Sequence, residues 1–225
     1  MNRILYFIVI FVVLAAAIPA FTATRFYLPS SGAAEVLPSL TNLGWGDTTS
    51  AAPDQIRMRQ RNISYTAFAN KTATFNVQNS ILYRQYVSDP IAGQTISGTL
   101  QGQIRASQGK ACTTEVGVYL VDNRGTYKST LLSLKTGVSA VAAALTNRYI
   151  PAPGTALTSQ TSVNGDRIVI EIGMNRTGAG NGASALECGD VAITDQTSDE
   201  TSTNQYNPWV EFSQDILFPS VTMIE

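Results

Sequence analysis

Short runs of β-branched and aromatic residues, separated by Gly, Asn, Asp and Pro, recur along the chain from Arg61 onward. This pattern is typical of successive antiparallel strands. Helical periodicity is weak throughout, and the single candidate, 138–145, could equally be a loop with one turn. We therefore expect an all-β fold, a single antiparallel β-sandwich, with strands at 63–68, 72–77, 81–87, 94–106, 112–121, 129–134, 147–150, 167–174, 183–188 and 209–212.

One run shows the alternation of a strand clearly, because Ile168, Ile170 and Ile172 occupy every second position. Successive side chains of a strand point to opposite faces of a sheet, so we expect this row in the core. The intervening row, Arg167, Val169 and Glu171, should face solvent or a partner surface. Turn residues support the strand assignment, since Asn164-Gly165 precedes this run and Asp122-Asn123-Arg124-Gly125 separates two others.

The N-terminus carries an unbroken apolar run from Ile4 to Ile18, closed by Pro19. As a helix the run would be about 22 Å long, shorter than the roughly 30 Å hydrocarbon core of a membrane. It is either a cleaved signal peptide, an uncleaved membrane anchor or a leader created by a start codon assigned too far upstream. We expect a hydrophobic helical leader at 1–22, an extended, loop-rich arm at 23–60 and the sandwich at 61–225. Any membrane contact should involve only 1–22.

Charge and composition exclude several kinds of function. Only 14% of the 225 residues are charged and the net charge is -1, so the chain lacks the basic field that nucleic-acid binding needs. Histidine is absent, which excludes Ser-His-Asp, Cys-His and His-zinc sites. We expect a protein that is not an enzyme and that has no metal or cofactor.

The two cysteines, Cys112 and Cys188, are too few and too far apart in sequence for a zinc site. They are either joined by a disulfide or present as two buried thiols. Export from the cytoplasm would favour the bridge, and assembly in the cytoplasm would favour the thiols.

Carboxylates occur on or beside the expected strands, but no spacing selects a catalytic pair from Glu115, Asp166, Glu171, Glu187 and Asp190. A Ser/Thr-rich loop adds an acidic group that is more readily explained as solvated than as a Ca²⁺ site, namely Asp190, Asp195, Asp199 and Glu200.

Exposed aromatic rings could stack on sugar rings. The candidates are Tyr83, Tyr86, Tyr119, Tyr127 and Trp209, although packing in the core is the favoured use of such residues in a sandwich.

Four segments together resemble a known family: Ala23-Thr24-Arg25-Phe26-Tyr27-Leu28-Pro29-Ser30-Ser31-Gly32, the stretch 81–106 with Arg84-Gln85-Tyr86-Val87 and Ser97-Gly98-Thr99, the stretch 165–173, and Asn207-Pro208-Trp209-Val210-Glu211-Phe212-Ser213. The chain resembles uncharacterised virion-associated proteins of tailed bacteriophages, whose members are jelly-roll-like sandwiches. The resemblance covers nearly the whole chain after the leader.

This resemblance implies a non-enzymatic component of a virion, as a decoration, tail or receptor-proximal protein. Its partners would be other virion proteins, copies of itself as a homo-oligomer, or cell-surface glycans. The motifs carry no catalytic role that could be assigned to residues here. The apolar leader departs from the family, whose members begin close to Ala23, and it favours the alternative of an exported or membrane-anchored carbohydrate-binding module.

Overall fold

The computed structural model describes residues 22–39, 44–46, 54–60, 66–75, 78–135, 138–191 and 193–220. These residues form strands and no helix, as expected of an all-β chain. In the described residues, therefore, no helix has the length and hydropathy needed to cross a membrane. The helix expected at 1–22 lies outside the described residues except for its last position, and so do 63–65 of the strand expected at 63–68. The rest of that expected strand, 66–68, is not in a strand, and the next strand begins at Ala69. The stretch 138–145 is not helical, and Ala140 instead forms a β-bridge with Thr113.

A seven-stranded sheet is built around β6 (Thr99–Gln108). On one side of β6 lie β14 (Trp209–Phe212) and β13 (Gly182–Cys188), followed by β1 (Thr24–Tyr27) and β3 (Ala69–Phe75). On its other side lie β9 (Thr146–Tyr149) and β10 (Thr155–Ala156). All of these pairings are antiparallel.

A five-stranded sheet has the order β2 (Asp54–Arg57), β4 (Ser80–Val87), β12 (Arg167–Arg176), β7 (Cys112–Val121) and β8 (Tyr127–Lys135). The pairing of β2 with β4 is parallel, and the others are antiparallel. A separate pair joins β5 (Thr95–Ile96) to β11 (Gln160–Thr161).

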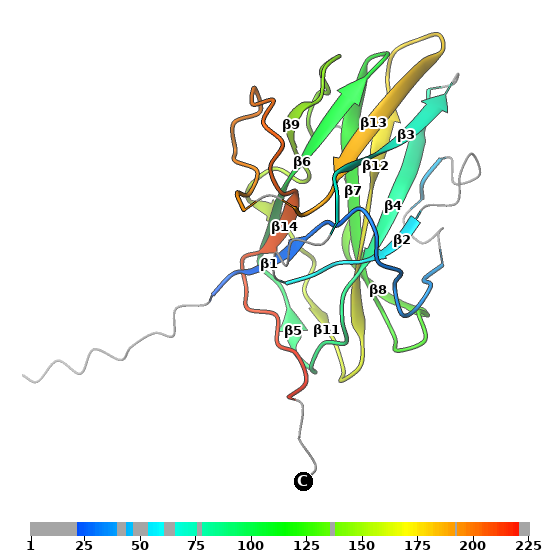
Figure 1. Ribbon diagram of the computed structural model, residues 1–225. Coiled ribbons are helices and arrows are strands. Elements are labelled where there is room, and N and C mark those ends of the chain that lie inside the picture. Colours follow the sequence, from blue (N-terminus) through cyan, green and yellow to red (C-terminus); the bar gives the residue numbers. More distant parts are fainter. Residues whose placement is uncertain are drawn as a thin grey trace, which may run out of the picture.

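The two large sheets lie face to face and share one hydrophobic core (Figure 1). Ile168, Ile170 and Ile172 are fully buried in this core, which confirms the predicted inward row. Across the core they are joined by residues of the seven-stranded sheet, including Leu100 and Phe212. The alternation of side chains along this run therefore predicted correctly which face of β12 lies in the core.

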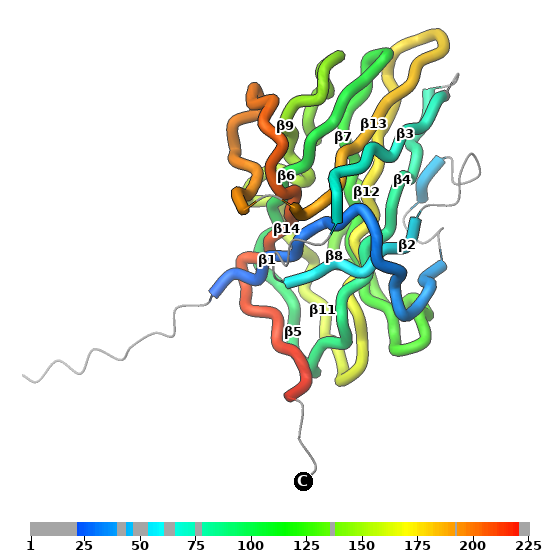
Figure 2. The backbone as a smooth tube through the Cα atoms, in the orientation of Figure 1, coloured from blue at the N-terminus to red at the C-terminus, as the bar shows by residue number. Residues whose placement is uncertain are grey.

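The other face of the five-stranded sheet is covered by the chain itself. We call residues 29–39 and 44–46 the cover segment; it follows β1 and leads toward β2 (Figure 2). Val169 is fully buried there in a second apolar cluster, against which Ala34 and Val36 of the cover segment pack. Arg167 and Glu171 of the same row are also buried, at 6% and 0% exposure. The row points away from the core, as expected, but it is buried by the chain's own cover segment instead of facing solvent or a partner surface.

The turns follow the expected chemistry. Gly125 has a φ of 87°, a conformation that costs a residue with a Cβ but suits glycine. Asp122 Oδ1 accepts hydrogen bonds from the backbone N–H groups of Arg124 and Thr126, both at 2.8 Å. These bonds to Thr126 and Arg124 lower the pKa of Asp122. Gly165, before β12, also has a positive φ, of 94°.

Both ends of the described chain meet at β1 and β14. Arg25 of β1 lies over the ring of Trp209, with 3.9 Å between the guanidinium carbon and the ring centroid. Its nitrogens form ion pairs with Glu211 at 2.8 Å and Asp195 at 2.5 Å. Tyr27 donates a hydrogen bond to the same Asp195 carboxylate at 3.0 Å. These contacts fix the loop before β14 against β1.

Candidate functional site

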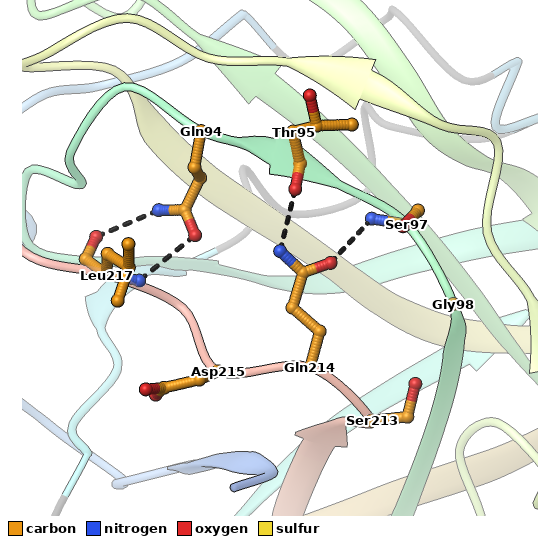
Figure 3. Close-up of a pocket in the computed structure, with 8 residues that line it drawn as sticks. All are labelled: Gln94, Thr95, Ser97, Gly98, Ser213, Gln214, Asp215 and Leu217. Carbon is orange, nitrogen blue, oxygen red and sulfur yellow. Dashed lines mark hydrogen bonds between the residues drawn. The ribbon is translucent and has the colours of Figure 1, made fainter. Parts of the chain in front are cut away.

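A hollow of about 560 Å³ lies where β5 and the start of β6 meet the segment after β14 (Figure 3). Its volume is within the range of roughly 300–1,000 Å³ typical of small-molecule sites. The lining combines amide, hydroxyl and carboxylate groups with one aliphatic side chain. The lining residues are Gln94, Thr95, Ser97, Gly98, Ser213, Gln214, Asp215 and Leu217.

The Gln94 side chain spans one end of the hollow and pairs with the backbone of Leu217. Its Nε2 donates to the Leu217 carbonyl at 2.9 Å, and its Oε1 accepts from the Leu217 N–H at 3.0 Å. Nε2 also donates to the carbonyl of Ala92 at 3.2 Å. Both N–H groups of this amide are thereby used, while its oxygen keeps one lone pair for a further donor.

Gln214 makes the corresponding contact in the opposite direction (Figure 3). Its Nε2 donates to the Thr95 carbonyl at 2.7 Å, and its Oε1 accepts from the Ser97 N–H at 2.8 Å. One N–H and one oxygen lone pair of this amide remain for a ligand. Because five hydrogen bonds to backbone orient the two amides, their polar atoms are fixed before any ligand arrives.

Asp215 is the charged residue of the lining, and its side chain is exposed. Within the described residues its carboxylate accepts one hydrogen bond, from Thr24 Oγ1 at 3.3 Å. The lining residues include no Lys or Arg. An anionic ligand would therefore meet one negative charge and no compensating positive charge.

A smaller hollow of about 260 Å³ shares Ser213 with the first and is lined also by Ala23, Thr99, Gln101 and Glu211. Ser213 Oγ accepts the Thr99 N–H at 2.9 Å and can still donate its own hydrogen. Gly98, with a φ of 85°, brings its backbone against this hydroxyl, since a Cβ there would lie 2.5 Å from Ser213 Oγ. Glycine is required at this contact both for its φ and for space.

A buried polar group lies under the cover segment and centres on Glu171. Its Oε2 accepts from Trp45 Nε1 at 2.6 Å, and its Oε1 accepts from Gln85 Nε2 at 2.6 Å and Tyr119 OH at 3.0 Å. Burial raises the pKa of this carboxyl, and the three donors oppose that effect. The group fastens the cover segment to the sheet.

Glu115 lies on the same face and is also fully buried. Its Oε1 accepts from Ser80 Oγ at 3.0 Å and Asn175 Nδ2 at 3.2 Å. Its Oε2 is buried without a hydrogen-bond partner. Burial raises the pKa of Glu115, and the two donors lower it less.

The remaining carboxylates considered from the sequence each have a structural contact. Asp166 pairs with Lys128 at 2.5 Å, and Glu187 pairs with Arg105. Asp190 accepts from the N–H and hydroxyl of Thr66. Asp199 accepts from Thr201, and Glu200 from Ser139 and Tyr149. Among the residues that the structure describes, no three Cys, Asp or Glu side chains gather as a metal site requires.

Four of the five aromatic residues considered for sugar stacking are buried. Tyr83, Tyr86 and Tyr119 are at most 1% exposed and Trp209 is 7% exposed, so their rings cannot stack on a ligand in this structure. Tyr83 and Tyr86 lie in the core between the sheets, Tyr119 lies in the second apolar cluster, and Trp209 lies under Arg25. Tyr127 is 40% exposed and lies 5.9 Å from Tyr119 between ring centroids.

Both cysteines are free, buried thiols, so the bridged alternative is not the one found. Cys112 Sγ lies 3.5 Å from Ser184 Oγ, whereas Cys188 is four residues further along the same strand as Ser184. At about 3.3 Å per residue, that is about 13 Å along the strand, beyond the roughly 7 Å limit for a disulfide. Burial raises the pKa of both thiols and keeps them protonated.

Sequence reasoning did not identify the hollow. Ser97-Gly98 and Ser213 belong to segments singled out for their resemblance, but nothing in the sequence linked them to Gln214 and Asp215. Polar residues at the ends of strands are common, and the contact between segments more than 100 residues apart appears only in the fold.

No protein-family pattern and no curated protein sequence matches the chain. Among solved structures it is similar to an aminopeptidase from the marine sediment archaeon Thaumarchaeota archaeon, with 12% identity over 87% of this chain and 37% of that one, at a TM-score of 0.45. A CocE/NonD family hydrolase from Staphylococcus aureus is similar with 11% identity over 88% and 35% of the two chains, at a TM-score of 0.29. The chain thus spans a little over a third of the length of these proteins, and similarity this low assigns it neither their fold nor their activity.

Proposed function

We propose that the chain is a non-enzymatic structural protein of a tailed-phage particle, built as a single jelly-roll-like sandwich. In this proposal it is a decoration or tail-associated protein that contacts other particle proteins or copies of itself. The basis is the sequence resemblance, together with the place of the resembling segments in the fold.

The four resembling segments are neighbours in the two sheets. Two of them supply β1 and β14, which pair with each other in the seven-stranded sheet, where β14 also pairs with β6. The stretch 81–106 supplies β4, β5 and most of β6, and the stretch 165–173 supplies most of β12, which pairs with β4. The resemblance therefore concerns the central framework of both sheets. This is the observation that carries the proposal. The resembling segments form the strands that hold the two sheets together, and such a likeness fits a structural protein.

The use of polar side chains agrees with a structural role. Glu171 and its three donors hold the cover segment, and Arg25 with its two carboxylates holds the loop before β14. Both groups bury or pair charges within the chain. They stabilise one arrangement of surface loops, as a protein that packs against neighbours requires.

The test is quantitative mass spectrometry of particles purified by density gradient from the phage that encodes the chain. We expect peptides from 23–220 in several copies per particle, enriched in parallel with the other particle proteins. A host periplasmic protein, followed in the same fractions, serves as the control for contamination. Recovery of the chain from the host envelope or medium, without enrichment in particles, would refute the proposal and favour the exported alternative.

A further inference from the structure

We propose that the hollow between β5 and the segment after β14 binds an uncharged, polyhydroxylated ring, such as one residue of a glycan. This inference goes beyond the structural role proposed above and does not depend on it. It uses none of the aromatic residues considered from the sequence. It rests on the shape of the hollow and on the polar atoms fixed around it.

The polar atoms of the lining offer both donors and acceptors to a ligand. Gln214 offers one N–H and one oxygen lone pair, and the Gln94 oxygen offers a second acceptor. The Ser213 hydroxyl can donate because its oxygen already accepts the Thr99 N–H. Adjacent hydroxyls of a sugar ring each donate and accept, so they match a mixed set of this kind. A purely apolar ligand would leave these groups unpaired.

The carboxylate of Asp215 selects against other classes of ligand. A carboxylate accepts hydrogen bonds from two neighbouring hydroxyls, as vicinal diols provide. Phosphates, sulfates and uronic acids would be repelled, since the lining residues hold one negative charge and no Lys or Arg. A Ca²⁺ ion prefers six to eight oxygen ligands, more than one exposed carboxylate supplies.

Leu217 completes the hollow with an aliphatic surface. Its side chain is 52% exposed, while its backbone is fixed by the Gln94 amide. Such a side chain can contact the C–H face of a sugar ring. Because the lining contains no aromatic ring, we expect weak binding, with a dissociation constant on the order of 1–10 mM.

The experiment is a titration of the full chain, followed by the side-chain NH₂ signals of Gln94 and Gln214 in ¹⁵N-correlated NMR spectra. The probes are D-glucose, D-galactose and N-acetyl-D-glucosamine, up to about 100 mM. Glycerol, D-glucuronate and CaCl₂ are titrated in parallel. We expect saturable shifts of both amides with at least one neutral sugar, no saturation with glycerol, and at least about fivefold weaker binding of glucuronate than of glucose.

Two variants of equal charge change locate the site. Asp215→Asn should weaken sugar binding about tenfold, because it removes a charged hydrogen-bond acceptor. Asp199→Asn removes an exposed carboxylate from another loop and should leave the affinity unchanged. Retained dispersion of the backbone amide signals shows that each variant is folded.

The proposal is overturned if no neutral sugar shifts these two amides saturably, or if only CaCl₂ does so. It is also overturned if glucuronate binds as tightly as glucose or if Asp215→Asn binds like the parent. None of these results depends on whether the chain is found in particles, so failure here and failure of the proposed function are distinguishable.

Discussion

Glutamine in place of Glu171 and of Glu115 should change stability in opposite directions. Both carboxyls are fully buried on the outer face of the five-stranded sheet, and the substitution has the same size and shape at each position. They differ in their hydrogen bonds, since both oxygens of Glu171 accept whereas Oε2 of Glu115 has no partner. The pair therefore separates the effect of a lost acceptor from that of a removed charge.

Glu171→Gln leaves one oxygen for three donors and places an NH₂ group against at least one of them. If the amide nitrogen takes the place of Oε2, the indole N–H of Trp45 loses its acceptor within the interior. A buried unpaired donor costs about 1–3 kcal/mol, so we expect a loss of that size. Glu115→Gln can keep Oε1 with Ser80 and Asn175 while removing a desolvated charge. We expect no loss, or a gain in stability, at pH 8.

The dependence on pH follows from the raised pKa of each carboxyl. Burial raises the folded-state pKa of Glu115 above the unfolded value of about 4.3, so the folded chain binds more protons between the two values. Stability then falls as pH rises through this window, by at most about 1.4 kcal/mol per pH unit for one proton. Below the window the penalty is absent, and above it the penalty is complete. Glu115→Gln should flatten this part of the curve.

Urea unfolding at pH 4 to 8, monitored by tryptophan fluorescence, measures both effects. The reasoning is refuted if the loss of unfolding free energy that Glu115→Gln causes relative to the parent is more than about 1 kcal/mol greater at pH 8 than at pH 4. It is also refuted if Glu171→Gln and the parent are equally stable at pH 7. An unchanged m-value is required for either comparison.

Three further predictions concern the core, the thiols and one turn. Ile170→Ala removes three buried carbon groups and should lower the free energy of unfolding by about 2–5 kcal/mol in the same urea assay. Ile193→Ala, at a side chain 96% exposed, should change it by no more than about 0.5 kcal/mol. Similar values for both variants would contradict the assigned face of β12. Cys112 and Cys188 should react with a thiol reagent only after unfolding, giving two thiols without reductant, and a count of zero would show a disulfide. Gly125→Ala places a Cβ at a φ of 87° and should cost about 1–2 kcal/mol in thermal or urea unfolding, and a neutral result would exclude the assigned turn.

The long strands were predictable because their side chains alternate. The ranges expected at 112–121 and 209–212 agree with β7 and β14, and the run at 167–174 differs from β12 by two residues. The single strand expected at 94–106 is wrong, because the structure divides it into β5 and β6. The strand β2 was missed, since Asp54–Arg57 has no β-branched pattern beyond Ile56 and is held by pairing with β4. The two-residue strands β10 and β11 are likewise defined by their partners.

The cover segment explains most of what could not be predicted about individual side chains. Trp45 belongs to the arm that the sequence predicts only as extended and loop-rich, yet its indole N–H donates a hydrogen bond to Glu171, 126 positions away. Tyr119, a candidate for sugar binding, is covered by the same segment. Burial of the second face of a sheet depends on where a distant loop packs, and local patterning contains no information about that.

The antiparallel pairing of β1 with β14 has a mechanical consequence. Thr24, the first residue of β1, lies opposite Phe212, the last residue of β14, so the two chain directions leave from the same end of the pair. A force pulling the ends apart would first meet the hydrogen bonds that hold Leu217 to Gln94 and Ala92. It would then load the bonds between these two strands one after another, beginning with the Thr24 N–H bond of 3.2 Å to Gln214. Strands that open in this sequence resist force less than strands sheared along their length. The Arg25 contacts to Glu211 and Asp195 lie next in the path of opening, so an attachment at both ends of the chain would strain this ion-pair group before it reached the core.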